Sequence, residues 1–410
     1  MANPVWGLLE KSQIDPEKIE EAIARLILEH EKDEESHLGP GESLTSHKAA
    51  LVIDHLVNSI VADKIKDGEV WERHRHSSSA WLRLLAMWPN EAIKILKIVW
   101  TGAAGQDYAR AVAFDGTYIY VGLSTDPAKV VKIDPATMTT VATWTGAAGV
   151  AYCYGLTFDG TYIYAGVNTS PAKVVKIDPA TMTTVATWTG ADGQNYCKAL
   201  TFDGTYIYAG LDISPGKVIQ IKRSDMTTNQ VWTGAAGENL CKALTFDGIY
   251  IYAGHAVAFD SPAKVVKIDP ATMTTVATWT GADGQNNLFA LTFDGTYIYA
   301  GLATIIAKVV KINPSTMATV LTWTGVAADD SCYGLTFDGV YIYAAVYTEP
   351  AKVVKINIAT MTTVSTWIGA AGENYCRVLT FDGNFLYIGN DINPAKLIRK
   401  IMRDINETGI

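Results

Sequence analysis

Residues 144–187 read WTGAAGVAYCYGLTFDGTYIYAGVNTSPAKVVKIDPATMTTVAT, and close copies of this stretch fill most of the 410-residue chain. Each copy begins with a tryptophan, and successive tryptophans are 44, 44, 44, 47, 44 and 44 residues apart. A supersecondary unit of roughly 40–50 residues repeated head to tail is typical of a closed β-propeller. The seven copies start at Trp100, Trp144, Trp188, Trp232, Trp279, Trp323 and Trp367.

The first copy divides into four predicted strands. Residues 109–114 form an apolar run, an Asp-Gly pair then makes a tight turn, and residues 118–122 alternate like a strand. Residues 129–133 and 139–144 are rich in valine, isoleucine and threonine, which favours two further strands. Four antiparallel strands in each of seven copies predict an all-β, seven-bladed β-propeller.

Closure of the ring depends on the segment before the first tryptophan. Residues 93–100, IKILKIVW, align with the fourth strand of every later copy, although no other strand of a copy precedes them. The last copy ends in residues 404–410, DINETGI, which is a poor strand sequence. We therefore expect residues 93–100 to complete the seventh blade, with a weak fourth strand at 404–410 as the alternative.

The repeat resembles a known family. The sequences AVAFDGTYIYVG at 111–122 and AKVVKIDPATMTTVAT at 128–143 are similar to the YVTN-type propeller repeats of surface-layer and other envelope proteins. The resemblance covers residues 100–410 and implies the fold. It does not imply one function, because propellers carry many unrelated activities.

Composition bounds the function. The chain is 49% apolar and 18% charged, as expected for a globular protein. Residues 1–92 carry 17 acidic and 10 basic side chains, which leaves a nearly neutral propeller with 25 and 23. Nucleic-acid binding is not expected, because it requires a concentrated basic surface. No run of 18 apolar residues and no leader-like start is present, so we expect neither membrane insertion nor a signal peptide.

The cysteines occupy one column of the repeat, nine residues after the tryptophan. Side chains in one column lie on different blades, and an odd number cannot pair without a remainder, so a disulfide framework is not expected. We expect small buried residues instead. The five are Cys153, Cys197, Cys241, Cys332 and Cys376.

An aspartate in the Phe-Asp-Gly turn recurs in every copy, on the same face as the Asp-Pro-Ala-Thr turn. We interpret it as turn chemistry and not as a catalytic set, because Asp-Gly is what a tight hairpin requires. The seven are Asp115, Asp159, Asp203, Asp247, Asp294, Asp338 and Asp382.

Variation concentrates on the opposite face. The column ten residues after the tryptophan is cationic or aromatic in every copy, a composition suited to stacking on sugars and to holding anions at the mouth of the central channel. The alternative is that these are solvated loop residues whose sequence varies without any function. The column is Arg110, Tyr154, Lys198, Lys242, Phe289, Tyr333 and Arg377. Candidate contacts from the neighbouring loop are Asp126, Asn168, Asp212, His255, Asn390 and Asp391.

No catalytic constellation stands out. The repeats contain one histidine, His255, and lack a Ser-His-Asp order and a Cys-x-x-Cys pair. The WTGAAG loops match no phosphate-binding spacing and open no helix. We therefore expect no enzyme and no cofactor, and a lyase of the type found on some propellers is the weakest alternative.

Residues 1–90 predict a helical assembly or anchor domain, followed by the propeller at 91–410. The sequence Asp15-Pro16-Glu17 caps one predicted helix, and residues 43–64 and 79–87 predict two more. Their apolar stripes favour self-association. Six of the seven histidines lie here, but their spacing matches no zinc pattern, so no metal is expected.

Residues 35–50, ESHLGPGESLTSHKAA, resemble the N-terminal segments of tailed-phage and prophage structural proteins. This resemblance implies attachment to a virion or extracellular assembly, with the propeller displayed outward. Together these features predict a non-enzymatic display or adhesion protein whose variable face binds a glycan or a cell-surface receptor. The alternative is a structural subunit of a filament, virion or surface layer without a small ligand.

Overall fold

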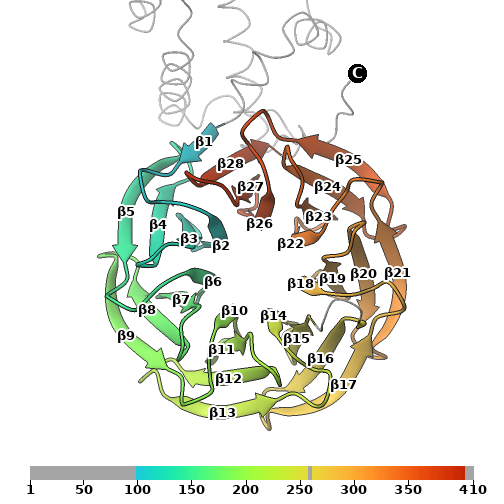
Figure 1. The fold of residues 1–410 in the computed structure, drawn as a ribbon, viewed down its shortest axis with the longest axis horizontal. Helices are drawn as coiled ribbons and strands as arrows, with labels where there is room; N and C mark the ends of the chain where they lie inside the picture. Colours follow the sequence, from blue (N-terminus) through green and yellow to red (C-terminus); the bar gives the residue numbers. More distant parts are fainter. Residues whose placement is uncertain (1–97, 257–260, 402–410) are drawn as a thin grey trace, which may run out of the picture. The chain divides into compact units, whose positions relative to one another are not determined.

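The computed structural model describes residues 98–256 and 261–401. These residues form seven four-stranded antiparallel sheets arranged as the blades of a propeller (Figure 1). Each blade except the last contains four strands that are consecutive in sequence, with the innermost strand first. The predicted seven-bladed all-β propeller is therefore confirmed. The helices expected in residues 1–90 lie outside the described residues.

The first three blades begin at β2. Blade 1 contains β2 (Ala109–Phe114), β3 (Ile119–Leu123), β4 (Lys129–Asp134) and β5 (Thr139–Thr145). Blade 2 contains β6 (Cys153–Phe158), β7 (Ile163–Val167), β8 (Lys173–Asp178) and β9 (Thr183–Thr189). Blade 3 contains β10 (Cys197–Phe202), β11 (Tyr206–Leu211), β12 (Lys217–Lys222) and β13 (Thr228–Thr233).

The next three blades repeat this order. Blade 4 contains β14 (Cys241–Phe246), β15 (Ile251–His255), β16 (Lys264–Asp269) and β17 (Thr274–Thr280). Blade 5 contains β18 (Leu288–Phe293), β19 (Ile298–Leu302), β20 (Lys308–Asn313) and β21 (Ala318–Thr324). Blade 6 contains β22 (Cys332–Phe337), β23 (Tyr341–Val346), β24 (Lys352–Asn357) and β25 (Thr363–Ile368).

Blade 7 is built from both ends of the propeller sequence. It contains β26 (Cys376–Phe381), β27 (Phe385–Asn390), β28 (Lys396–Ile401) and, as its outermost strand, β1 (Ile98–Thr101). β1 pairs antiparallel with β28, with Val99 opposite Ile398 and Trp100 opposite Leu397. The segment before the first tryptophan therefore supplies the closing strand. Residues 93–97 and 404–410 lie outside the described residues.

The repeated tryptophan joins neighbouring blades. Trp144 Nε1 in blade 1 donates a 2.9 Å hydrogen bond to Thr184 Oγ1 in blade 2, and five other repeats make the same bond. Trp100 of β1 makes it to Thr140 of blade 1. The closing strand is thus paired with β28 of its own blade and bonded to blade 1.

The cysteine column fills the space between adjacent blades. All five thiols are free and buried, which confirms the sequence expectation. A Cβ placed on Gly122 would lie 2.6 Å from Cys153 Sγ of the next blade, so the glycine makes room for the sulfur. Burial raises the pKa of these thiols, for Cys197 to about 12.

The invariant face is held by local turns and by contacts between blades. Asp159 Oδ1 accepts hydrogen bonds from the backbone of Thr161 and Tyr162, and Oδ2 accepts one of 2.8 Å from Tyr164 Oη. Lys132 Nζ reaches across to donate 2.9 Å to Pro179 O of blade 2. Equivalent aspartate bonds occur in all seven blades, which supports turn chemistry as their role.

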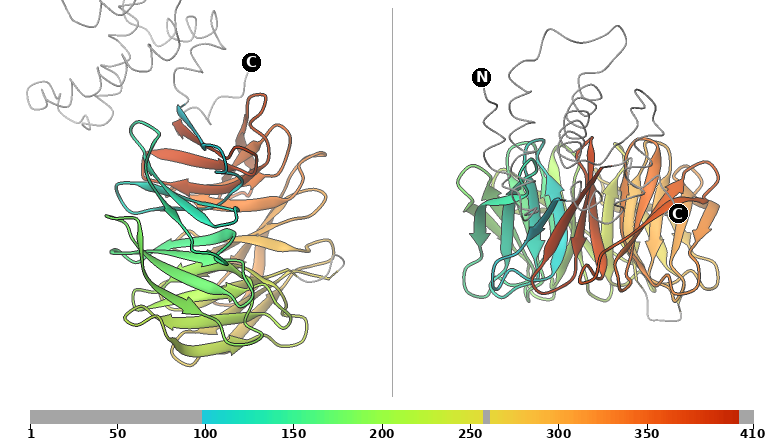
Figure 2. Two further views of the ribbon diagram at one scale, coloured as in Figure 1. Left: turned by 60° about the vertical axis from the view of Figure 1, so that its left-hand side comes forward. Right: turned by 90° about the horizontal axis from the view of Figure 1, so that it is seen from above.

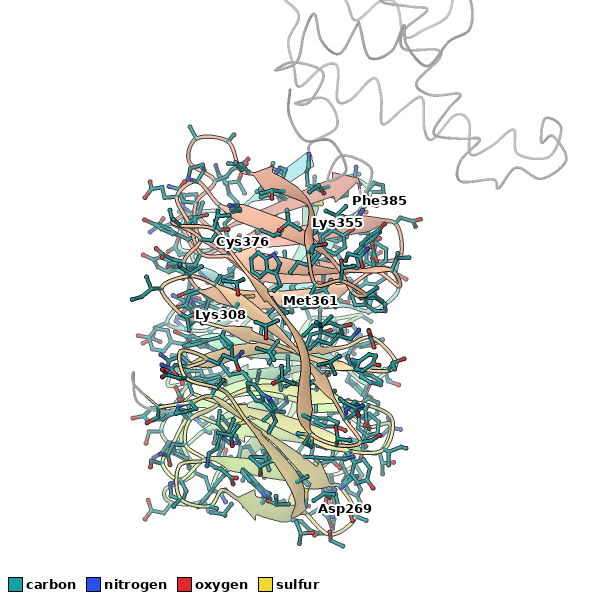
Figure 3. The ribbon with its side chains drawn as sticks, turned by 90° about the vertical axis from the view of Figure 1, so that its right-hand side faces the viewer. Asp269, Lys308, Lys355, Met361, Cys376 and Phe385 are labelled. Atoms are coloured by element: carbon teal, nitrogen blue, oxygen red, sulfur yellow. The ribbon has the colours of Figure 1, made fainter. Side chains whose placement is uncertain are left out.

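The propeller has two faces that carry different residues. The side view separates Cys376 and Lys308, toward one face, from Lys355 and Phe385, toward the other (Figure 3). Strands run between the two faces in every blade (Figure 2). The candidate site lies on the face that carries Cys376, where each inner strand begins.

Candidate ligand-binding site

The variable column is the second residue of each inner strand. In β6 the burial pattern alternates from Cys153 onward, so the cysteine enters the interface between blades while Tyr154 is partly exposed. Successive strand residues point to opposite sides, which sends the whole column toward the central channel. We call these residues, one from each blade, the mouth ring: Arg110, Tyr154, Lys198, Lys242, Phe289, Tyr333 and Arg377.

The backbone that leads into each inner strand is pinned on both sides. Tyr152 has a left-handed φ of 59°. Its N–H donates 2.9 Å to Thr125 O of the preceding blade, and its carbonyl accepts 2.9 Å from the N–H of Asn168 in its own blade. Because these bonds fix the strand two residues before Tyr154, the mouth ring stands on a rigid support.

Cationic side chains of the mouth ring lie against aromatic rings of neighbouring blades. Lys198 Nζ lies 3.4 Å from the ring centroid of Tyr154, and the guanidinium carbon of Arg110 lies 5.4 Å from the same centroid. Lys242 Nζ lies 5.6 Å from the centroid of Phe289. Such cation–π contacts each contribute about 0.5–2 kcal/mol, depending on desolvation.

The contacts continue through blades 5 to 7 and close on blade 1. The rings of Phe289 and Tyr333 meet edge to face with centroids 4.7 Å apart, and the Arg377 guanidinium lies 4.5 Å from the Tyr333 centroid. Arg377 and Arg110 both reach the buried carboxylate of Asp391, at 3.5 Å and 2.9 Å. The structure therefore links the predicted column by contacts between neighbouring blades, except between Lys198 and Lys242, for which no contact is found in the described residues.

Lys198 lies in a strongly positive environment. Burial, with smaller contributions from the positive charges of Lys242, Arg377 and Arg110, lowers its pKa to about 8 against the opposing effect of Asp212. These cations come from blades 4, 7 and 1. The cationic side chains of the mouth ring therefore act on one another electrostatically across blades.

A cavity of about 210 Å³ lies at the ring. Tyr154, Lys198, Phe289, Tyr333 and Arg377 line it together with apolar side chains of the inner strands. Pockets for drug-sized ligands usually measure roughly 300–1,000 Å³, so this cavity suits one small group or one sugar unit.

The predicted loop contacts separate into three groups. Asp212 and Asp391 join the mouth ring, where Asp212 Oδ2 accepts 2.6 Å from Lys242 Nζ. Asp126 is exposed and Asn168 is partly exposed. His255 and Asn390, in contrast, are fully buried at the ends of their strands.

The two buried residues are held by the blade interfaces. His255 Nδ1 lies 3.1 Å from Asn239 O and its ring lies 5.4 Å from that of Trp232, while Asn390 Nδ2 donates 2.7 Å to Asn374 O. Burial lowers the pKa of His255 to about 4, which keeps its imidazole neutral. A ligand on the surface has no access to either residue in this structure.

Sequence reasoning missed a tyrosine column eight residues after the tryptophan. Tyr108, Tyr152 and Tyr196 are about 40% exposed, and all have left-handed φ angles, which bulky residues rarely adopt. Four of the seven copies have tyrosine in this column, and they belong to consecutive blades, 7, 1, 2 and 3, beside the mouth ring. We call them the tyrosine arc: Tyr375, Tyr108, Tyr152 and Tyr196. Their recurrence in this column was the available signal.

Tyr347 was also missed, because only one copy carries tyrosine at that position. Its ring stacks on Tyr375 with centroids 4.8 Å apart and meets Tyr333 edge to face at 4.9 Å. Its hydroxyl donates 3.3 Å to Asp391 Oδ2. Tyr347 therefore connects the tyrosine arc to the mouth ring.

The described residues offer no group of three or more histidine, cysteine or acidic side chains arranged to hold a metal ion. Within the same ranges, 98–256 and 261–401, no helix is long and apolar enough to cross a membrane.

Fold and site define a seven-bladed β-propeller with a cationic and aromatic mouth. Among solved structures, the chain is similar to the hydrazine synthase of Kuenenia stuttgartiensis, with a TM-score of 0.63 and 14% identity over 73% of this chain and 97% of that one. At this identity the likeness shows the fold alone. No protein-family model and no curated protein matches the sequence.

Proposed function

We propose that this protein is a non-enzymatic display or adhesion protein whose mouth ring binds a glycan. The observation that carries the proposal is the contrast between the two faces. One face repeats the same turns and the same blade-to-blade bonds, whereas the other presents seven large cationic or aromatic side chains, five of which line one cavity.

The chemistry of the mouth ring suits sugars. Aromatic rings offer flat apolar surfaces to the C–H faces of a sugar, and cationic side chains donate hydrogen bonds to hydroxyl and acidic oxygens. The tyrosine arc adds exposed rings around part of the mouth.

Display from an assembly would give several propellers one common support. We propose that residues 1–90 self-associate, because their predicted apolar stripes exceed what so short a segment can bury alone. Linked sites raise the apparent affinity by 10²–10⁴ without any new contact, roughly what weak sugar binding requires.

One observation favours the alternative, a structural subunit of a filament, virion or surface layer. Valines on the outer strands are exposed at equivalent positions around the ring, among them Val141, Val185 and Val276, each at 50%. Repeated apolar side chains on an outer rim can mediate lateral packing, although isolated exposed valines are common on monomers.

A glycan array with the full chain tests the proposal. Wild type is compared with a variant in which Tyr154, Lys198, Lys242 and Tyr333 are changed to alanine. The matched control changes Thr117, Thr161, Thr205 and Thr296 to alanine, because these exposed residues occupy turns of the opposite face. We expect the mouth variant to lose binding and the control to retain it, with unchanged circular dichroism for both. No binding by wild type would favour the structural subunit.

A further inference from the structure

We infer that the mouth ring selects acidic glycans, and that Lys198 binds the anionic group of the bound sugar. This inference rests on the proposed glycan-binding function and names the class of glycan. The anionic group is a carboxylate or a sulfate, and the two share the negative oxygens that an ammonium group recognises.

The charges of the site are not balanced. The mouth ring contributes four cations, Arg110, Lys198, Lys242 and Arg377, while the carboxylates that contact it are Asp391 and Asp212. Both arginines converge on Asp391, and Lys242 is paired with Asp212. An anion entering this space would reduce the repulsion among cations that come from four different blades.

Lys198 is the ring cation without a carboxylate partner among the described residues. Its printed contact is the face of Tyr154, and within residues 98–256 and 261–401 no hydrogen-bond acceptor or carboxylate lies within bonding distance of its Nζ. Three N–H donors on one ammonium group therefore remain for a ligand or for water. The Tyr154 contact keeps this charge at the cavity wall.

The cavity places an aromatic pair together with two cations. At about 210 Å³ it is lined by Lys198 and Arg377 from two blades and by the Phe289–Tyr333 pair. A sugar can stack on the aromatic pair while its acidic group faces Lys198.

The test measures binding of the full chain to matched oligosaccharides that end in a neutral, carboxylated or sulfated sugar. Wild type is compared with Lys198→Gln, with the charge-conserving Lys198→Arg, and with Lys222→Gln. Lys222 lies in the same blade, at the end of β12 toward the opposite face, so its replacement removes the same charge away from the mouth.

We expect wild type to bind an acidic terminus about 10- to 100-fold more tightly than its neutral match, the range typical of a hydrogen bond to a charged group. Lys198→Gln should remove this preference, while Lys198→Arg and Lys222→Gln retain it. The carboxylated and sulfated arms identify the anionic group.

Two results would overturn the inference in distinguishable ways. Equal affinity for acidic and neutral termini, still lost in the four-residue mouth variant, would refute acidic selection but leave glycan binding intact. Wild type that binds no oligosaccharide at all would refute both proposals. An acidic preference that survives in Lys198→Gln would show that Lys198 does not bind the anion.

Discussion

Lys198 Nζ in blade 3 lies 3.4 Å from the ring centroid of Tyr154 in blade 2. The two residues are 44 positions apart and occupy the same column of the repeat. Each blade places this column at the start of its inner strand, so the residues of adjacent copies can contact each other. Where adjacent copies carry different residues, two different side chains meet, as Lys198 and Tyr154 do. The properties of the mouth therefore depend on the order of residues around the ring.

Lys198 should lose its proton at an unusually low pH for a lysine. Its pKa of about 8 predicts a neutral amine in much of the folded protein at pH 9, whereas a solvated lysine stays charged. An NMR titration of the lysine side chains should show one resonance, absent in Lys198→Arg, with a midpoint near 8. A midpoint above 10 would contradict the desolvated site.

The same shift fixes the sign of two pH dependences. Affinity for an anion at Lys198 should fall as the pH rises through about 8, because the ammonium group is lost. Between about 8 and 10.5 the unfolded chain binds this proton and the folded chain does not, so the contribution of Lys198 to the free energy of unfolding rises with pH. Binding isotherms from pH 6 to 10 check the first expectation, with Lys198→Arg as the control.

Trp100→Ala should destabilise the propeller about as much as Trp144→Ala. Both indoles are buried, at 3% exposure, and both donate to a threonine of the next blade. Removal of a buried tryptophan side chain typically costs about 3–5 kcal/mol. Urea denaturation of the two variants measures the losses. If Trp100→Ala left stability unchanged, β1 would not be an integral part of blade 7.

The five thiols should be inert in the folded protein. Burial raises the pKa of Cys197 and Cys332 to about 12 and raises the others as well, so little thiolate forms near neutral pH. A thiol reagent that reports by absorbance should react with none of them in buffer and with all five in denaturant. Rapid reaction of even one native thiol would contradict the packing of that blade interface.

Asp203→Ala should weaken the fold and leave ligand binding intact. The carboxylate accepts 2.7 Å hydrogen bonds from Thr205 N, Tyr206 N and Tyr208 Oη, and the loss of these bonds should cost about 1–3 kcal/mol. Thermal unfolding measures this loss. Asp225→Ala in the same blade is the matched control, with a smaller expected effect because Asp225 is exposed. Reduced glycan affinity in stably folded Asp203→Ala would implicate the wrong face.

Self-association should require the N-terminal segment. Light scattering should find an oligomer for residues 1–410 and a monomer for residues 91–410, which retain β1. The apolar stripes predicted at Ile19, Ile23 and Leu26 motivate this expectation, since they would otherwise face water. A full chain that is monomeric at micromolar concentration would contradict it.

Short windows of the sequence were enough to predict the blades. Alternating apolar residues, the Asp-Gly turns and the 44-residue period act over a few residues or repeat regularly, so they predict strands, hairpins and closure into seven blades without any long-range information. The burial of the cysteines and the structural role of Asp203 and its equivalents followed from the same local rules. The variable column was recognisable because its neighbours scarcely change.

Contacts between blades were decided only by the tertiary structure. Asn390 and Asp391 are adjacent in sequence, and both were expected at the ligand-binding surface, yet Asn390 is buried in the blade interface while Asp391 holds Arg110 and Arg377. Strand side chains alternate with a period of two, so a shift of one residue exchanges the interface for the mouth. The same alternation places His255 in the blade interface and Lys198 at the mouth. Their surroundings depend on residues from other blades, which the ring brings together across long separations in sequence.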